Sequence, residues 1–305
     1  MIPYTGADVG LLDGLKRLFA KGPAKKKLKV IDIAKRFDLR GRTGQGSMSK
    51  VFQAYDRELG RTVCLKVLDK VKTATFEGRF KGLNKPSEGE ICTQLRHANL
   101  VATYEHGITN KGEPYLVMEW IEGYGLNFLI ETKSPQLKPH AFDYLIQMCE
   151  AVSYMHQQRF LHRDICPRNA MINKEGVLKL IDFGLTIPYK PEFCRPGNRT
   201  GTADYLAPEL IKRQATDHRV DLFALGVTAY EVFIGHLPWE RAASSEETLR
   251  RHMNTPARDP RTLKTGLPEG LYRFLERAVA REREVRFQTA AEMRDSLKAL
   301  SQASV

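Results

Sequence analysis

Three polar side chains in the middle of the sequence have the types and spacing that a proton acceptor and a metal site need. In FLHRDICPRNAMI, Asp164 is followed five residues later by Asn169, and the later segment LKLIDFGLT supplies Asp182. A carboxylate such as Asp164 can accept the proton of a substrate hydroxyl. An amide oxygen and a second carboxylate are hard ligands of the kind that Mg²⁺ prefers. We therefore predict a proton acceptor at Asp164 and a Mg²⁺ site at Asn169 and Asp182.

A glycine-rich segment upstream could hold an anionic group. LRGRTGQGSMSKV contains Gly44 and Gly46 between two segments that look like paired strands. Glycines let the backbone turn tightly and approach phosphate oxygens, which a Cβ would obstruct. A plain hairpin turn explains the same pattern, so the two glycines indicate a phosphate site only in combination with charged residues further along the chain.

A lysine and a glutamate are candidates for a buried ion pair. In TVCLKVL, strand alternation places Lys66 on one face of a half-buried strand, where its charge needs an anionic partner. In SEGEICTQLRH, the positions three, four and seven residues after Glu88 are apolar, whereas those after Glu90 are polar. Glu88 therefore belongs to the packed face of a helix, and we predict that it pairs with Lys66.

The elements that must position these residues form two lobes. Residues 37–120 contain short segments rich in β-branched and aromatic residues with turn signals between them, which predicts a small antiparallel sheet with one main helix ending near Arg96. After Gly123 the pattern is mostly helical up to about Leu300. The predicted fold class is α+β, with a hinge near Trp120 to Gly125.

Composition narrows the class of protein. Hydrophobic residues make up 42% of the 305 residues and charged residues 28%, values that are ordinary for a soluble globular protein. The five cysteines form no CxxC pair, which indicates neither a zinc knuckle nor a disulfide framework and favours a reducing compartment. No stretch reaches the roughly 20 apolar residues of a membrane span, and no secretory signal is visible. We expect a cytoplasmic location.

The N-terminal segment has a character of its own. Apolar positions between residues 8 and 21 predict an amphipathic helix, and residues 24–36 follow as a basic connector within a chain of net charge +12. Three interpretations stay open: a solvated arm, docking on the small lobe or another subunit, and contact with an anionic membrane surface. We favour docking, and we expect no specific nucleic acid partner.

Taken together, the segments GQGSMSKV, VCLK, HRDICPRN, DFG and APE resemble the signature set of protein kinases, in the order of that family. The resemblance runs from about residue 37 to residue 300, and RFQTAAEMRDSL resembles the last helix of the eukaryotic-like Ser/Thr kinases of bacteria. It implies a bilobal kinase domain at 37–300, with an N-lobe at 37–120, a C-lobe at 121–300, an N-terminal region at 1–36 and a tail at 301–305. ATP with Mg²⁺ would be the cofactors, and Ser or Thr hydroxyls of proteins would accept the γ-phosphoryl group, with Asp164 as base.

The same resemblance implies roles for further residues. Lys66 would hold the α- and β-phosphates. The residues assigned to the adenine pocket are Val51, Cys64 and Met171 around the ring, Met118 as gatekeeper, and Glu119 and Trp120 with backbone hydrogen bonds at the hinge. Two other roles would maintain structure: Glu209 of APE would pair with Arg286, and Asp221 would hold the backbone of the catalytic loop.

The sequence departs from the kinase pattern at three places. Ser49 replaces the third glycine of the phosphate loop, with a modest effect expected on nucleotide affinity. Cys166 replaces the lysine that neutralises charge on the transferring group, and Arg168 either substitutes for it or is an exposed arginine without a role. GTADYLAPE lacks a proline but keeps Thr202, which would bond to Asp164 and favours Ser/Thr specificity.

Two other classes remain as alternatives. A pseudokinase, a nucleotide-binding or scaffolding module with little transfer, is favoured only by Ser49 and Cys166. A small-molecule kinase would generally lack an APE-type segment. Arg163 is a cation that the activation segment would have to neutralise, and Thr200 is the best-placed hydroxyl for an activating phosphosite, although a plain loop threonine fits nearly as well.

Overall fold

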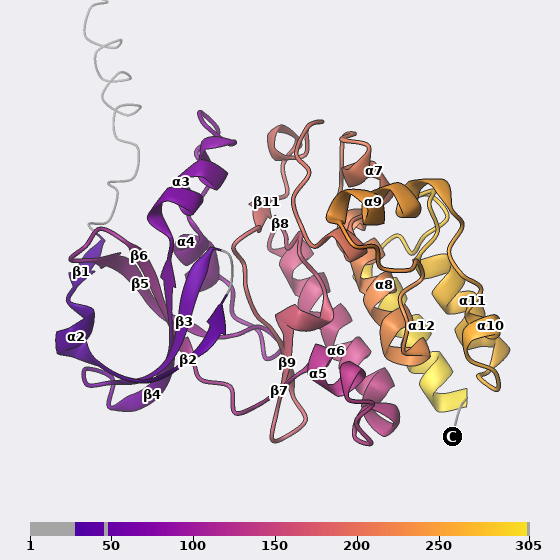
Figure 1. Cartoon of the computed structure of the whole chain (residues 1–305), viewed down its shortest axis with the longest axis horizontal. Helices are drawn as coiled ribbons and strands as arrows, with labels where there is room; N and C mark the ends of the chain where they lie inside the picture. The colour runs from indigo at the N-terminus through magenta and orange to yellow at the C-terminus, as the bar shows by residue number, and fades with distance from the viewer. Residues whose placement is uncertain (1–27, 46–47, 304–305) are drawn as a thin grey trace, which may run out of the picture.

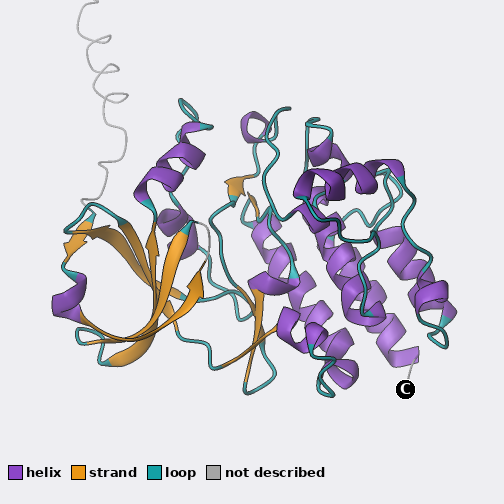
Figure 2. Cartoon of the chain, viewed as in Figure 1, coloured by secondary structure: helices purple, strands orange, loops and turns teal. Residues whose placement is uncertain are grey.

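The computed structural model describes residues 28–45 and 48–303, which form two lobes lying side by side (Figure 1). Strands dominate the small lobe and helices dominate the large lobe (Figure 2). The predicted α+β class and bilobal architecture are confirmed. The predicted N-terminal helix and Gly46 lie outside the described residues.

The small lobe is built on a six-stranded sheet in the order β1-β5-β6-β4-β3-β2. All neighbouring strands are antiparallel except β1 and β5, which run parallel. The strands are β1 (Lys29–Ile31), β2 (Phe37–Gln45), β3 (Ser49–Asp56), β4 (Arg61–Leu68), β5 (Thr103–Thr109) and β6 (Pro114–Glu119). Because successive side chains of a strand point to opposite faces, Val63 and Leu65 of β4 lie on the same face, and both are buried in the core of this sheet.

The sheet begins earlier in the chain than the sequence indicated. Residues 29–36 are not the basic connector that their composition predicts, because they form β1 and the short helix α2 (Ile33–Arg36). Arg36 is buried and donates to both carboxylate oxygens of Asp56, at 3.0 and 2.7 Å, and to Glu105 at 2.5 Å. This network attaches the segment to β3 and β5, so these residues are an integral part of the small lobe.

Two longer helices accompany the sheet. α4 (Glu88–Gln94) begins with a capping box between Ser87 and Glu90 and is the helix that the sequence predicted. α3 (Lys70–Gly78) follows Asp69, whose side chain caps the helix by accepting hydrogen bonds from two backbone N–H groups. The sequence did not predict this helix. α3 lies at the top of the small lobe in Figure 1, on the side of that lobe nearest the large lobe.

The large lobe packs its helices around one buried helix. The helices are α5 (Leu126–Glu131), α6 (Leu137–Gln157), α7 (Pro208–Ile211), α8 (Arg219–Ile234), α9 (Ser245–Asn254), α10 (Pro260–Leu263), α11 (Glu269–Ala278) and α12 (Ala290–Ala303). The central helix is α8, in which nearly every side chain is buried, as its continuous apolar run predicted. It ends where Gly235 adopts the left-handed conformation, with φ of 81°.

Short strands of the large lobe lie next to the small lobe. β7 (Gly123–Gly125), β9 (Ala170–Asn173) and β10 (Leu178–Leu180) form one antiparallel sheet, and β8 (Phe160–Leu161) pairs with β11 (Ile187–Pro188). They fix the two loops that carry Asp164 and Asp182. Among the described residues, no helix combines the length and the apolar character needed to cross a membrane.

Candidate active site

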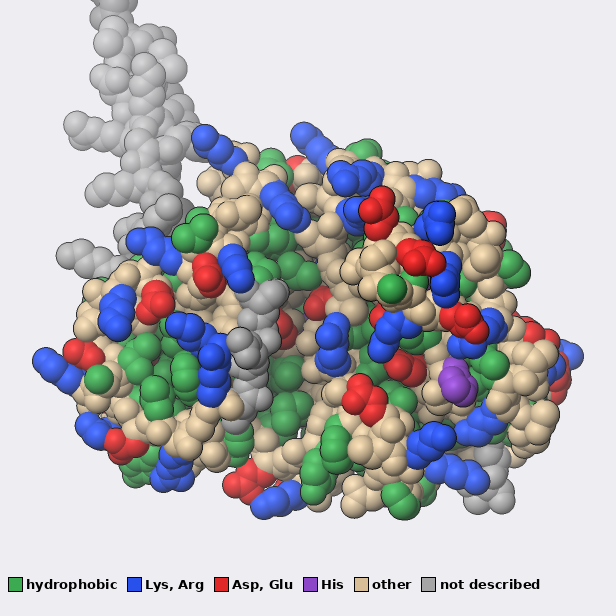
Figure 3. All heavy atoms as spheres, viewed as in Figure 1, with side chains coloured by type: hydrophobic (Ala, Val, Ile, Leu, Met, Phe, Trp, Pro, Cys, Tyr) green, Lys and Arg blue, Asp and Glu red, His purple; other side chains and the backbone are tan. Residues whose placement is uncertain are grey.

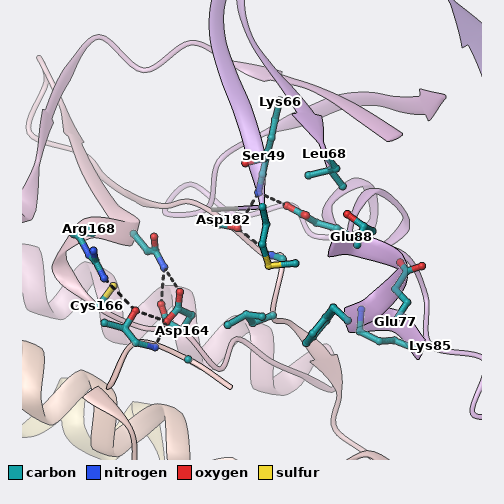
Figure 4. A pocket seen from close by; sticks show the side chains of 18 residues that line it. Ser49, Lys66, Leu68, Glu77, Lys85, Glu88, Asp164, Cys166, Arg168 and Asp182 are labelled. Carbon is teal, nitrogen blue, oxygen red and sulfur yellow. Dashed lines mark hydrogen bonds and ion pairs between the residues drawn. The ribbon is translucent and has the colours of Figure 1, made fainter. Parts of the chain in front are cut away.

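Lys66 of β4 joins two carboxylates from different parts of the chain. Its Nζ lies 2.6 Å from Glu88 Oε1 on α4, which is the predicted pair, and 2.8 Å from Asp182 Oδ1. The charge of Lys66 outweighs the effect of burial on Asp182 and lowers the pKa of that carboxyl to about 2. Asp182 is therefore ionised at neutral pH, as a metal ligand must be. Lys66 extends from the strand toward both partners in Figure 4.

The carboxylate of Asp164 is oriented by two neighbours. Its Oδ1 accepts hydrogen bonds from Thr202 N and Thr202 Oγ1, both at 2.8 Å. Its Oδ2 accepts from Asn169 Nδ2 at 2.9 Å, and the same amide group donates to Asp164 O at 2.8 Å. Because the Asn169 amide nitrogen is used in this way, its oxygen is left as the atom that can bind a metal.

Asp221 of α8 holds the loop that carries Asp164 through hydrogen bonds. Asp221 accepts from the backbone N–H of His162 at 2.9 Å and of Arg163 at 2.8 Å, and its carboxylate lies 2.9 Å from His156 Nε2. These contacts hold Arg163 at a φ of 67°, a conformation that a non-glycine residue rarely adopts. The predicted role of Asp221 in holding this backbone matches the observed contacts.

Arg168 and Cys166 lie beside Asp164 in different environments. Arg168 is exposed, and its Nη2 lies 3.4 Å from Thr202 Oγ1. The side chain of Cys166 is buried, and burial raises the pKa of its thiol to about 11. The thiol is therefore neutral, and Arg168 is the cation nearest to this end of the site in Figure 4.

The residues assigned to the adenine pocket lie on the strands β3, β4, β6 and β9 and on the connection that follows β6. Val51 of β3 is opposite Lys66 of β4, and Cys64 is opposite the buried Met118 of β6. Met171 lies on β9, and Gly44 is opposite Val51 in the β2–β3 ladder.

At the hinge, the backbone N–H of Glu119 already has a hydrogen-bond partner within the protein. The N–H of Glu119 already donates to Ala102 O at 2.9 Å, so a backbone bond from Glu119 to a nucleotide would have to use its carbonyl group. The carboxylate of Glu119 accepts from Ala102 N at 2.7 Å and pairs with Lys179 at 2.8 Å. Trp120 follows in the connection and is half-buried.

A buried ion pair stabilises the segment that follows Thr202. Both terminal nitrogens of Arg286 donate to the carboxylate of Glu209, at 2.8 and 2.9 Å, and Arg286 is fully buried. Arg286 also donates to the carbonyls of Ala280 and Arg281. This is the predicted pairing of Glu209 with Arg286.

An aromatic cluster, which sequence reasoning missed, connects α3 to the segment after Asp182. The ring of Phe80 lies 5.5 Å from Phe76 and 5.7 Å from Phe193, and all three side chains are buried. Ile187 of β11 belongs to the same cluster. A signal was present, because Phe76 and Phe80 are four residues apart and therefore share one face of a helical stretch.

One cavity of about 410 Å³ lies between the lobes, and the residues assigned to the adenine pocket are not among those that line it. Lys66, Glu88, Asp164, Asn169 and Asp182 face it, together with Arg168 and Thr202. Glu77 and Lys85 line its α3 side, on the far side of Glu88 from Arg168 in Figure 4. The cavity thus brings together a carboxylate that can accept a proton, two oxygen ligands for a hard metal ion and three cations, Lys66, Lys85 and Arg168, which suits the transfer of an anionic group.

The oxygen donors of the site suit a metal ion that is held mainly by the phosphates of a bound substrate and only partly by the protein. Within the described ranges, no cluster of three or more His, Cys, Asp or Glu side chains is arranged to hold a metal ion. Asp182 and Asn169 instead supply one carboxylate and one amide oxygen. Mg²⁺ characteristically binds through one or two protein oxygens plus substrate phosphates, and these residues fit that pattern.

Comparison with known proteins agrees with this geometry. The model of the protein kinase domain family matches residues 37–296. The chain is 32% identical over 277 residues to serine/threonine-protein kinase PknB of Mycobacterium tuberculosis, covering 87% of this chain and 43% of that protein. It is 31% identical over 284 residues to a probable serine/threonine-protein kinase of Corynebacterium efficiens, covering 90% of this chain and 42% of that protein.

The chain therefore spans less than half the length of these curated relatives. Family membership rests on the domain that it shares with them, which covers most of this chain and includes every residue of the cavity described above. The chain belongs to the protein kinase domain family.

Proposed function

We propose that this chain is an ATP-dependent protein kinase that transfers the γ-phosphoryl group of ATP to Ser or Thr hydroxyls of protein substrates. The observation that carries this proposal is the orientation of Asp164, whose carboxylate is held from one side by Asn169 and from the other by Thr202. A fixed carboxylate that faces a cavity can accept a proton from a bound hydroxyl without reorganisation. The names of the relatives support the same reaction.

In the proposed reaction, the substrate oxygen attacks the γ-phosphorus and passes its proton to Asp164. The new O–P bond forms as the bond between the γ-phosphorus and the bridging oxygen breaks, and ADP leaves with that electron pair. Lys66 would bind the α- and β-phosphates, and Glu88 would keep it in place. Mg²⁺ held by Asp182 and Asn169 would neutralise charge on the phosphates. Arg168 would contribute the positive charge that Cys166 cannot.

Transfer of labelled phosphate from ATP to a generic basic protein in the presence of Mg²⁺ tests the proposal. We expect Asp182→Asn and Lys66→Met each to abolish transfer while leaving the circular dichroism spectrum unchanged, because one removes the metal carboxylate and the other the phosphate contact. Asp295→Asn is the matched control, since this exposed carboxylate lies on α12 and is absent from the cavity. A folded Asp182→Asn variant with near wild-type turnover would exclude the assigned site.

The same assay separates the alternatives. A pseudokinase would bind nucleotide in a thermal-shift measurement but show no transfer above that of the Lys66→Met variant. A small-molecule kinase would consume ATP without labelling protein. The segment around Thr202 and Glu209, held by the buried Arg286, favours a protein acceptor.

We also propose that the protein works in the cytoplasm. The five cysteines are free, which suits a reducing compartment.

We further propose that the N-terminal segment docks on the small lobe or on another subunit. For the segment, the apolar positions between residues 8 and 21 support docking, and the lysines beside them support contact with an anionic membrane. Deleting residues 1–27 should lower the melting temperature or change the oligomeric state under docking. Loss of anionic-vesicle binding alone would instead establish a membrane tether.

A further inference from the structure

The contact between α3 and residues 185–207 brings exposed cations from the two lobes together. Arg79 and Lys81 are the direct neighbours of Phe80, whose ring lies 5.7 Å from that of Phe193, and Arg195 follows Phe193 by two positions. All three cations are exposed. In Figure 3, Lys and Arg side chains gather along the top of both lobes, where α3 and α7 lie in Figure 1. This side of the molecule therefore carries positive charge.

Two further cations belong to a loop next to the active-site cavity and to its attachment point. The N–H of Gly197 donates to Arg213 O at 3.1 Å, which fastens the loop to the chain just after α7. Arg199 on this loop precedes Gly201, which lines the cavity, by two positions. Arg199 and Arg213 are both exposed. The basic surface consists of the exposed side chains of Arg79, Lys81, Arg195, Arg199 and Arg213.

The cations of the basic surface have no carboxylate partner. Within residues 28–45 and 48–303, none of the five forms an ion pair. Arg79 instead lies over the ring of Phe76, with Cζ 5.8 Å from the ring centroid, and Arg213 Nη1 lies 3.5 Å from Gly197 O. Because neither contact neutralises a charge, all five positive charges are available to an anionic partner.

The carboxylates of the same segments are fewer, and they are paired or half-buried. Residues 70–87 contain five Lys or Arg and one Asp or Glu, and residues 185–213 contain five and three. Of these four acidic residues, Asp204 and Glu209 form ion pairs within the protein, and the other two are half-buried. A basic partner would thus find little free negative charge here, whereas an acidic partner would find five unpaired cations.

Two other anionic partners fit the basic surface less well. A membrane surface and a single-stranded nucleic acid are typically bound by cations together with exposed apolar or aromatic side chains, which insert or stack. In the described part of the chain, no large hydrophobic side chain with high exposure lies in 79–87 or 185–213. The basic surface also lies beside the cavity that contains Asp164, where a peptide must bind to be phosphorylated. Its position and composition therefore favour an acidic peptide.

We propose that the basic surface selects acidic protein substrates, in which the Ser or Thr acceptor is flanked by Asp and Glu residues. The acceptor hydroxyl lies at Asp164, and carboxylates elsewhere in the same peptide pair with the cations of the basic surface. Exposed ion pairs are individually weak, so selection depends on several of them acting together. This inference rests on the proposed function, because it names the class of protein on which the same site would act.

Three peptides test the proposal with the full chain, ATP and Mg²⁺. They are identical except that the residues on both sides of a single serine are all Glu, all Gln or all Lys. We expect kcat/KM for the Glu peptide to exceed that for the Gln peptide by about tenfold, mainly through a lower KM, because several weak ion pairs act together. The preference should shrink as the salt concentration rises. A basic test protein should be a slower acceptor than the Glu peptide. Equal kcat/KM for the three peptides would overturn the proposal.

Charge-reversal variants locate the preference. Arg195→Glu with Arg199→Glu should remove the preference for the Glu peptide and leave kcat/KM for the Gln peptide within about twofold of wild type. Lys81→Glu repeats the test on the small lobe and should weaken the preference by roughly threefold. Lys111→Glu with Lys138→Glu is the matched control, because it makes the same change of net charge at exposed positions outside the cavity. Circular dichroism establishes that each variant is folded. An equal loss of preference in the control would mean that net charge, and not the basic surface, attracts acidic peptides.

Peptide binding without ATP separates this inference from the proposed function. Fluorescence anisotropy of the three labelled peptides should rank them as the kinetics do. Tighter binding of the Glu peptide that the double variant loses, without transfer to any peptide, would support the basic surface and contradict the kinase activity. Transfer at equal kcat/KM for all peptides would support the kinase activity and contradict the basic surface. Binding of anionic vesicles or single-stranded DNA that the double variant loses, without a preference among the peptides, would assign the surface to that partner and contradict the proposal.

Discussion

At the scale of single residues, the candidate active site differs from the kinase signature in where its positive charge is located. The residue two positions after Asp164 is the buried, neutral Cys166, so it contributes no charge to the cavity. Arg168 reaches the same region from two positions further along, with its guanidinium 3.4 Å from Thr202 Oγ1. Within the described part of the chain, no ion pair occupies Arg168. Its charge is thus available to an incoming anionic group.

Arg168→Ala should lower kcat by about 100-fold to 1000-fold, the usual effect of removing one preorganised donor, and should change the KM for ATP far less. Steady-state kinetics with varied ATP separates the two parameters. In the Arg168→Ala background, Cys166→Lys should partly restore kcat, because the new ammonium group would reach the same cavity. An unchanged kcat in Arg168→Ala would show that another group neutralises the phosphoryl charge.

A buried histidine should make stability depend on pH. His252 of α9 lies against Trp239, with ring centroids 4.1 Å apart, and burial lowers its pKa to about 4. In the unfolded chain the imidazole of His252 binds a proton near pH 6.5, whereas in the folded chain it does so only near pH 4. The burial of neutral His252 therefore contributes fully to stability above pH 6.5, and this contribution is lost as the pH falls to 4. The loss should be about 3 kcal/mol from this group.

Urea unfolding of wild type and His252→Phe at pH 7 and pH 4.5 measures this contribution. The difference in unfolding free energy between the two pH values should be smaller in His252→Phe, which cannot titrate. The exposed His140, replaced in the same way, should leave the difference unchanged. A pH dependence that is identical in wild type and His252→Phe would contradict the assignment.

How far the sequence predicted the residue contacts depends on how local they are. The choice of Glu88 over Glu90 required only the face of one helix, and the structure has that pair at 2.6 Å. The contacts of Arg36 with Asp56 and Glu105 required the order of strands in the sheet, which no spacing reveals. A basic residue in a basic stretch therefore looked like part of a connector.

At the scale of elements, α3 connects the small lobe to the segment that follows Asp182. Phe80, just after this helix, packs on Phe193, and the side chain of Lys85 lies over Phe76, with Nζ 5.4 Å from the ring centroid. Phe80 and Phe193 are more than a hundred residues apart in the chain, so no local pattern could have predicted that they meet. The packing keeps the segment near residue 193 against the small lobe.

Phe80→Ala should loosen this packing. Removing a buried phenyl ring typically lowers the free energy of unfolding by about 3 to 5 kcal/mol. The segment around Phe193 should then open, and limited proteolysis should cut between residues 187 and 200 faster than in wild type. Phe128→Ala is the control, because this ring is 47% exposed and stacks on the exposed Tyr124. Equal cleavage rates for Phe80→Ala and wild type would show that α3 does not hold the segment.

At the scale of the whole molecule, β1 covers an edge of the sheet. Deletion of residues 1–36 removes β1 and Arg36, which exposes the backbone of β5 and leaves the carboxylate of Asp56 buried without its cation. Relative to a chain that lacks only residues 1–27, we expect a loss of about 3 to 5 kcal/mol in urea unfolding and self-association in light scattering. If both deletions behave alike, the network around Arg36 contributes little.

The large lobe is held together by contacts between distant parts of the chain. Arg286 pairs with Glu209, and α12 packs on α6, although most of the sequence of the lobe lies between these two helices. Such contacts form slowly because long loops must close first. During synthesis, α6 and the apolar α8 leave the ribosome long before Arg286 and α12 can cover them. We therefore expect the nascent large lobe to expose apolar surface, and to need chaperones, until translation has passed α12.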